Sequence, residues 1–171
     1  PDYVEQAALA ADSSRYILTE VMGFIEEADD SDEKYDIYIK NLGNSLWGVT
    51  QYESEGSSFI KIRNNYDNMS NFCSDSNELL WLTVAHEFFH AIQYTYRQSS
   101  SDSYFREMTS MWFENVFVEN CYDFLDFTDM SSSSLFNNPE GYFDENQSGS
   151  YGYSLALYGH YLSTIVDPEG I

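Results

Sequence analysis

The first 70 positions of the chain show two patterns of apolar residues, one typical of a helix and a later one typical of strands. From Val4 to about Ile25 apolar residues recur every three to four positions, which predicts an amphipathic helix. Residues 26–33 are mostly acidic and are expected to form a loop. Short segments rich in aromatic and β-branched residues then predict three strands, over residues 35–39, 46–52 and 58–63.

Helical spacing returns after a turn-rich break at 64–68. A helix capped by Ser76 or Asn77 is predicted to reach about Tyr96. Further helices are predicted over residues 104–119 and 122–127, and a polar stretch rich in serine, asparagine and glycine covers residues 131–150. A final helix is predicted over residues 151–165, with Pro168 beyond its end.

This order of elements is typical of an α+β fold. The sequence contains no internal repeat and no linker that would divide it, so we expect a single domain over residues 1–171. Its parts would be a leading helix and acidic loop (1–33), a small N-terminal sheet with an edge strand (34–70) and a helical part (77–171).

Charge narrows the range of partners. Seven basic residues stand against 29 acidic ones, which gives a formal net charge of −22. Such a surface repels nucleic acid and anionic lipid, so we expect neither as a partner. A solubilising surface explains the acidity most simply, and a preference for basic substrates is the alternative. No apolar run reaches 18 residues, so no membrane span is expected.

The two cysteines, Cys73 and Cys121, are 48 positions apart and form no CxxC motif. They would form a disulfide in an exported protein, or remain as two buried thiols.

The segment His86-Glu87-Phe88-Phe89-His90 has the H-E-x-x-H pattern of zinc peptidases. Residues four apart lie on one face of a helix, so His86 and His90 can bind one metal ion. Glu87 lies beside them, where it can act as a base. The chain has only three histidines, and a structural helix that carries the pattern by chance is the alternative reading.

A catalytic zinc ion needs a third protein ligand. The extended pattern H-E-x-x-H-x-x-G-x-x-H is excluded, because Gln93 and Tyr96 occupy the positions of its glycine and third histidine. Glu107 is the preferred third ligand, since it lies early on the following helix and can face His90. Glu114 shares a helix face with Glu107 and either orients a ligand histidine or is solvated. The other candidates considered are Asp102, Glu119 and His160.

The segment Arg-Glu-Met-Thr-Ser-Met-Trp-Phe-Glu over residues 106–114 resembles the third-ligand helix of gluzincin metallopeptidases. Together with the His86–His90 motif, it is similar to a group of exported bacterial metalloproteases first noticed in myxobacteria. The resemblance covers about residues 34–165 and implies a zincin-like catalytic core, one Zn²⁺ per chain and a secreted or extracellular protein whose signal segment has been removed. Arg106 departs from the asparagine often found before the ligand glutamate. No Gly-x-Met-x-Asn signature precedes the motif, which argues against an aminopeptidase.

The expected activity is that of a zinc metalloendopeptidase that acts on proteins or peptides. Zinc lowers the pKa of a bound water towards ~7, and Glu87 accepts its proton. The developing oxyanion needs a donor. Tyr151, whose position resembles that of the catalytic tyrosine of gluzincin aminopeptidases, is preferred, followed by Tyr153 and then His160.

The strand at residues 59–63 is the expected edge for peptide substrates. Two alternatives to the peptidase remain, a catalytically inactive binding module and a zinc hydrolase of a non-peptide amide.

Overall fold

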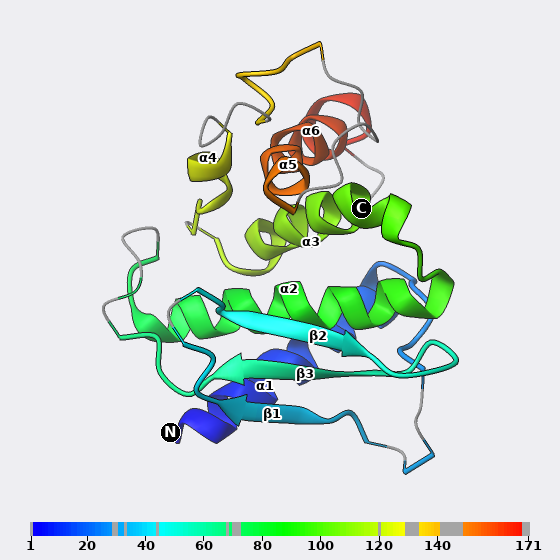
Figure 1. The fold of residues 1–171 in the computed structure, drawn as a ribbon, viewed down its shortest axis with the longest axis vertical. Coiled ribbons are helices and arrows are strands. Elements are labelled where there is room, and N and C mark those ends of the chain that lie inside the picture. Colours follow the sequence, from blue (N-terminus) through cyan, green and yellow to red (C-terminus); the bar gives the residue numbers. More distant parts are fainter. Residues whose placement is uncertain are drawn as a thin grey trace.

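The computed structural model describes residues 2–28, 31–32, 34–43, 45–67, 69, 73–119, 121–128, 134–140 and 149–168. The fold is α+β, as predicted, with one small mixed sheet and several helices. Two layers meet at the long helix α2, which crosses the middle of the molecule (Figure 1). The sheet and α1 lie on one side of α2, and the helices α3 to α6 lie on the other.

The N-terminal helix α1 spans Tyr3–Tyr16 and continues into one π-helical turn, η1, at Ile17–Val21. The predicted helix is therefore present but ends before Ile25. Gly23 follows with a φ of 76°, a conformation that glycine adopts without strain. The buried side of α1 carries small residues, Ala7, Ala10, Ala11 and Ser14, which allow a close approach to α2.

The sheet contains β1 (Ile37–Lys40), β2 (Gly48–Tyr52) and β3 (Ser58–Arg63) in the order β1-β3-β2. β3 pairs parallel with β1 and antiparallel with β2. The prediction that residues 59–63 form an edge was therefore wrong, because β3 is the central strand and buries Ile60 and Ile62 completely. The edges are β1 and β2, and β2 is the edge that lies beside α2.

Helix α2 spans Ser76–Tyr96. Its cap is Asp75 rather than Ser76 or Asn77: a carboxylate oxygen of Asp75 accepts hydrogen bonds from the backbone N–H groups of Asn77 and Glu78, at 2.8 and 2.9 Å. Every residue from Leu82 to Ile92 is buried. A helix buried on all sides must be covered by two layers, which is how the sheet and α3 enclose it.

The second layer begins with a 3₁₀ turn, η2 (Ser100–Asp102), and α3 (Ser103–Phe117). It continues with α4 (Phe124–Phe127), α5 (Gly149–Ser154), α6 (Ala156–Tyr161) and a π-helical turn, η3 (Leu162–Val166). The predicted helices are thus confirmed, although the last is divided at Leu155. Most of the polar stretch at 131–150 lies outside the described residues.

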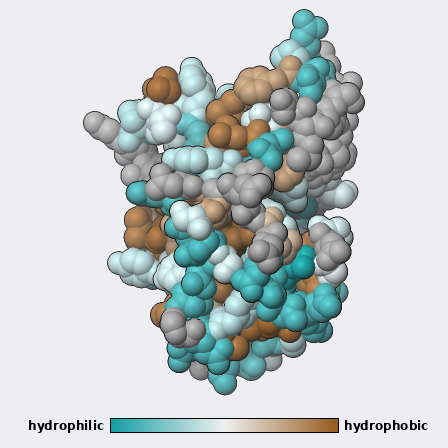
Figure 2. All heavy atoms as spheres, turned by 90° about the vertical axis from the view of Figure 1, so that its left-hand side faces the viewer, coloured by the Kyte–Doolittle hydropathy of each residue, from teal (hydrophilic) through white to brown (hydrophobic). Residues whose placement is uncertain are grey.

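Two features bear on the setting of the protein. A disulfide joins Cys73, before α2, to Cys121, after α3, and this bond is compatible with an extracellular protein. In the ranges that the structure describes, no helix has both the length and the apolar character needed to cross a bilayer. The side view in Figure 2 shows a mainly hydrophilic surface over the lower layer and more exposed hydrophobic groups over the upper helices.

Candidate metal centre

His86, His90 and Glu107 lie together where α2 faces α3, as predicted. Oε2 of Glu107 is 3.2 Å from Nε2 of His86 and 3.3 Å from Nε2 of His90. One ligand atom from each residue lies within 4.8 Å of the other two. The two histidines are buried and Glu107 is partly buried. The three residues could therefore hold a metal ion.

The charge state of Glu107 suits a metal ligand. Burial alone would raise the pKa of this carboxyl group, but the imidazoles of His90 and His86 outweigh burial and hold the pKa far below its usual range. Glu107 is therefore a carboxylate, and it directs that negative charge at the two imidazole Nε2 atoms.

A second acidic residue orients His86. Nδ1 of His86 lies 2.5 Å from Oε1 of Glu114, which is almost fully buried. When Nδ1 donates to Oε1 of Glu114, Nε2 is the ring nitrogen that remains for a metal ion. Glu114 therefore orients a ligand histidine, which is one of the two roles that the sequence allowed for it.

His90 is oriented by neutral groups. Its Nδ1 lies 2.9 Å from Oε1 of Gln93 and 3.2 Å from Oγ of Ser110. The amide nitrogen of Gln93 donates to Oγ1 of Thr109 at 2.8 Å, which fixes the amide oxygen towards His90. Gln93 and Ser110 were not predicted as site residues, although Gln93 is one helical turn after His90 and its contact could have been anticipated from that spacing.

Asp123 extends the polar chain behind His86. Burial raises the pKa of Asp123, and burial together with the charge of Asp123 raises the pKa of Glu114 well above its usual range. Oε2 of Glu114 and Oδ1 of Asp123 are buried and have no donor among the described residues. The two carboxyl groups interact, and a shared proton would reduce the repulsion between them. Asp123 was not anticipated, because the sequence does not show how the helix predicted at residues 122–127 lies against Glu114.

Glu87 faces the sheet side of the site. It is buried, and the hydroxyl group of Thr50 lies 2.7 Å from both its backbone oxygen and its Oε2. Gly48 allows this approach of β2, since a Cβ atom there would lie 2.7 Å from Cγ of Glu87. The carboxylate of Glu87 is therefore held by β2 while its backbone belongs to α2.

A cavity of about 290 Å³ opens beside these residues. Leu46, Trp47, Leu82, Met111 and Phe127 give it an apolar wall, and His86, Glu87, Glu114, Asp123 and Tyr153 are its polar lining. A larger cavity of about 860 Å³ lies between α1 and β1, but none of the three potential ligands lines it. The smaller cavity reaches the metal-binding cluster through His86, with Glu87 and Tyr153 beside it.

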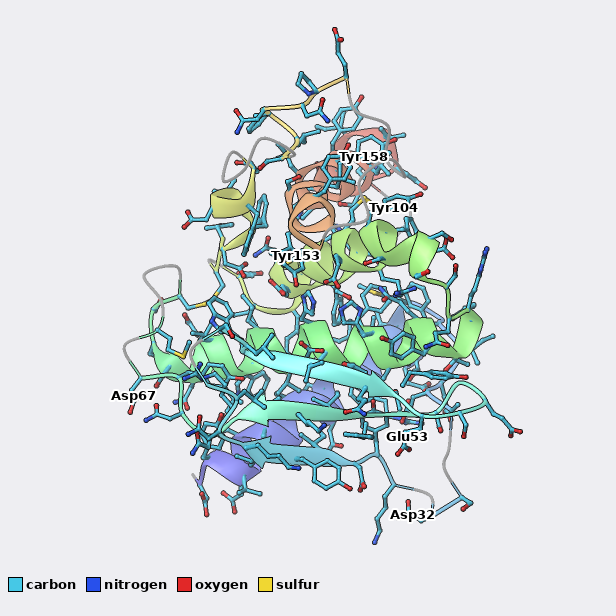
Figure 3. The ribbon with its side chains drawn as sticks, in the orientation of Figure 1. Asp32, Glu53, Asp67, Tyr104, Tyr153 and Tyr158 are labelled. Atoms are coloured by element: carbon cyan, nitrogen blue, oxygen red, sulfur yellow. A yellow bond between two sulfur atoms is a disulfide. The ribbon has the colours of Figure 1, made fainter. Side chains whose placement is uncertain are left out.

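The two candidate tyrosines lie in different surroundings. The ring of Tyr153 is 6.0 Å from that of His86, the residue lines the cavity, and Figure 3 shows it directed from α5 towards α2. Burial, with the nearby carboxylates, raises its pKa, so Tyr153 keeps its proton. Tyr151 is 1% exposed and packs with Met108 and Leu155, away from the lining of the cavity. By position, Tyr153 rather than Tyr151 faces the metal-binding cluster.

The remaining candidates lie elsewhere. Nε2 of His160 is 3.0 Å from Oδ1 of Asn115, and its ring packs on Phe124. Asp102 pairs with Arg97 at 3.1 Å, and Glu119 is exposed beyond the end of α3. None of the three belongs to the metal-binding cluster.

Comparison with known proteins adds no assignment: no protein-family model, no curated protein and no solved structure matches this chain.

Proposed function

We propose that the chain is a zinc-dependent endopeptidase, with zinc held by His86, His90 and Glu107. The observation that carries the proposal is the spacing of their ligand atoms. Tetrahedral zinc with bonds of 2.0–2.1 Å requires ligand atoms about 3.3 Å apart. The distances of 3.2 and 3.3 Å from Oε2 of Glu107 to the two Nε2 atoms agree with this requirement.

The chemistry of the donors also fits zinc. Two imidazole nitrogens and one carboxylate form a three-ligand set that leaves a fourth position open. When bound, zinc would polarise a substrate carbonyl group and lower the pKa of a water molecule.

A residue of the chain itself can transfer the proton of the attacking water. Glu87 is adjacent to His86 in the helix and lines the same cavity, which suits a general base that takes a proton from water and later gives it to the leaving amine. Thr50 holds one carboxylate oxygen of Glu87, at 2.7 Å. We assign Tyr153, rather than Tyr151, as the donor to the developing oxyanion, because its hydroxyl group lies beside Glu107 and keeps its proton.

The sheet offers a peptide substrate a free edge beside the site. Among the described strands β2 pairs only with β3, so its outer edge is available to an extended peptide. Gly48 and Thr50 of that strand contact Glu87 directly. A peptide added to β2 would therefore pass over the base, which favours a peptide over a non-peptide amide as the substrate.

An inactive binding module is the weaker alternative, because a site that only holds zinc has no need of the buried, oriented carboxylate of Glu87. We also infer an exported protein, which the disulfide supports.

The test combines metal analysis with digestion of a peptide library. Wild type should hold close to one zinc per chain and cleave internal peptide bonds. His90→Ala should lose both properties, and Glu87→Gln should keep zinc but lose cleavage. Equal cleavage by Glu87→Gln and wild type would reject the mechanism, and equal zinc content in His90→Ala and wild type would reject the site.

A further inference from the structure

The face of the sheet that points away from α2 carries basic and aromatic side chains. We call it the basic sheet face, and its residues are Tyr38, Lys40, Val49, Gln51, Phe59, Lys61 and Arg63. Strand register places Lys61 beside Tyr38 and Val49, and Arg63 beside Lys40. The helices lie behind the opposite face (Figure 1), so none of the described elements covers this one.

This face holds three of the seven basic residues in a chain with 29 acidic ones. Within the described ranges, the lysines and arginines that pair with a carboxylate are Arg15 and Arg97, so Lys40, Lys61 and Arg63 remain unpaired. The carboxylate of Asp36, at the edge of the face, instead accepts a hydrogen bond from the hydroxyl group of Tyr38 at 2.7 Å.

Neutral groups hold the three cations in place. Nζ of Lys40 lies 5.1 Å from the ring centre of Tyr38, and Nζ of Lys61 lies 4.9 Å from that of Phe59. Lys61 also donates to Oε1 of Gln51 at 2.6 Å, and Arg63 donates to backbone carbonyl groups of the loop before β2. Their positions are therefore set while their charges are left without a counter-charge.

We propose that the basic sheet face binds a short, extended, acidic segment of a partner protein. Lys61 and Arg63 are two residues apart on one strand, which separates them by about 7 Å along it. Alternate side chains of an extended peptide repeat at the same interval, so two carboxylates of such a segment can meet the two cations. Tyr38 and Phe59 precede Lys40 and Lys61 by two residues on the same face, so their rings offer apolar contact to the next side chain on that side of the segment.

The size of the face excludes larger anions. Three strands of four to six residues span about 10 by 20 Å, and the Debye length is about 8 Å at physiological salt. Beyond that area lie carboxylates such as Asp32, Glu53 and Asp67, which Figure 3 shows around the sheet. A membrane or a long nucleic acid would extend over these carboxylates and be repelled, whereas a short peptide would remain within the field of the cations.

The proposal can be tested by fluorescence anisotropy with a labelled octapeptide of alternating glutamate and serine. The same peptide with glutamine in place of glutamate is the control. The protein is the full chain with Glu87→Gln, so that the probe is not cleaved. One variant adds Lys40→Gln and Lys61→Gln, and a matched variant adds Lys34→Gln and Arg97→Gln, which removes the same charge elsewhere.

We expect the acidic peptide alone to bind. The Lys40→Gln/Lys61→Gln pair should weaken its binding about two- to thirtyfold, because one carboxylate loses Lys61 and the other loses Lys40, which lies beside Arg63. The matched pair should weaken it much less. Absence of binding, or equal weakening by both pairs, would overturn the proposal. So would tighter binding of an oligothymidine or of vesicles that contain phosphatidylserine than of the acidic peptide.

Discussion

The hydroxyl group of Thr50 lies 2.7 Å from a carboxylate oxygen of Glu87 and 2.7 Å from its backbone oxygen. A residue of the sheet edge thus fixes the rotamer of a side chain on α2. One hydroxyl proton serves two acceptors, and the carboxylate is the acceptor that can turn away when the hydroxyl group is lost. This relationship predicts that catalysis depends on β2 without any contact between β2 and the metal ligands.

Thr50→Val should keep the shape of the residue but release the carboxylate of Glu87. We expect unchanged zinc content and a kcat/KM for peptide cleavage lower by about 10- to 100-fold, because a misplaced base loses its alignment with the reacting atoms. Thr50→Ser, which keeps the hydroxyl group, should stay close to wild type. Equal activity of the valine and serine variants would show that this hydrogen bond does not position Glu87.

Metal affinity should depend on Glu114, although Glu114 is not a ligand. Glu114→Ala removes the acceptor for Nδ1 of His86, and we expect zinc affinity to fall about 10- to 100-fold. The zinc affinity of Glu114→Gln should fall less, since the amide oxygen of the glutamine still accepts that hydrogen bond. Competition with a chromophoric chelator measures the affinity, and Glu119→Ala, an exposed change close by, is the control. A Glu114→Ala protein that binds zinc like this control would contradict the assigned role.

The cluster of His86, His90 and Glu107 could be predicted because it depends on short-range geometry. The helical repeat places residues four apart on one face, and a short connection between two helices brings an early residue of the second near the end of the first. The orienting contacts of Gln93 and Glu114 follow the same periodicity. Asp123 escaped prediction because its contact with Glu114 depends on how the chain folds back after α3, which no spacing in the sequence reveals.

Two choices could not be made from the sequence because they depend on long-range packing. Alternation along residues 58–63 shows that one face of β3 is buried, but not which strands lie on either side of it. Tyr151 and Tyr153 are two residues apart, about 200° around a helix, so only one of them can face α2. That choice depends on how α5 packs on α3, where Gly152 approaches the backbone of Tyr104.

The disulfide should contribute substantially to stability. It closes a loop of 48 residues, for which the chain-entropy estimate is about 4 kcal/mol of unfolding free energy. Cys73→Ser with Cys121→Ser should therefore lower the urea midpoint clearly, and addition of a reductant to wild type should reproduce the shift. An unchanged midpoint in the double variant would show that the bond does not stabilise the fold.

Stability should be lost at alkaline pH through buried tyrosines. Burial raises the pKa of Tyr3 to about 12 and raises the pKa values of Tyr35 and Tyr66 further. A group whose pKa is higher in the folded protein stabilises it fully below the unfolded pKa, about 10, and less as the pH rises through the folded value. Absorbance at the tyrosinate band should therefore rise together with unfolding above pH ~10. Tyr35→Phe should move the transition to higher pH, and a transition unaffected by this change would exclude Tyr35 as a cause.

The last prediction separates the two tyrosines. Tyr153→Phe removes a hydroxyl group that lines the cavity beside Glu107 and His86, so zinc content should be kept while kcat falls by about 10²–10³-fold. KM should change less, because an oxyanion donor acts mainly on the transition state. Tyr151 lies in the packed interior with Met108 and Leu155. Tyr151→Phe should therefore affect thermal stability and leave kcat within about twofold of wild type. Steady-state kinetics on one peptide, with melting curves for both variants, make the comparison. A fall in kcat for Tyr151→Phe that matches or exceeds the fall for Tyr153→Phe would return the role to Tyr151 and contradict the geometry of the cavity.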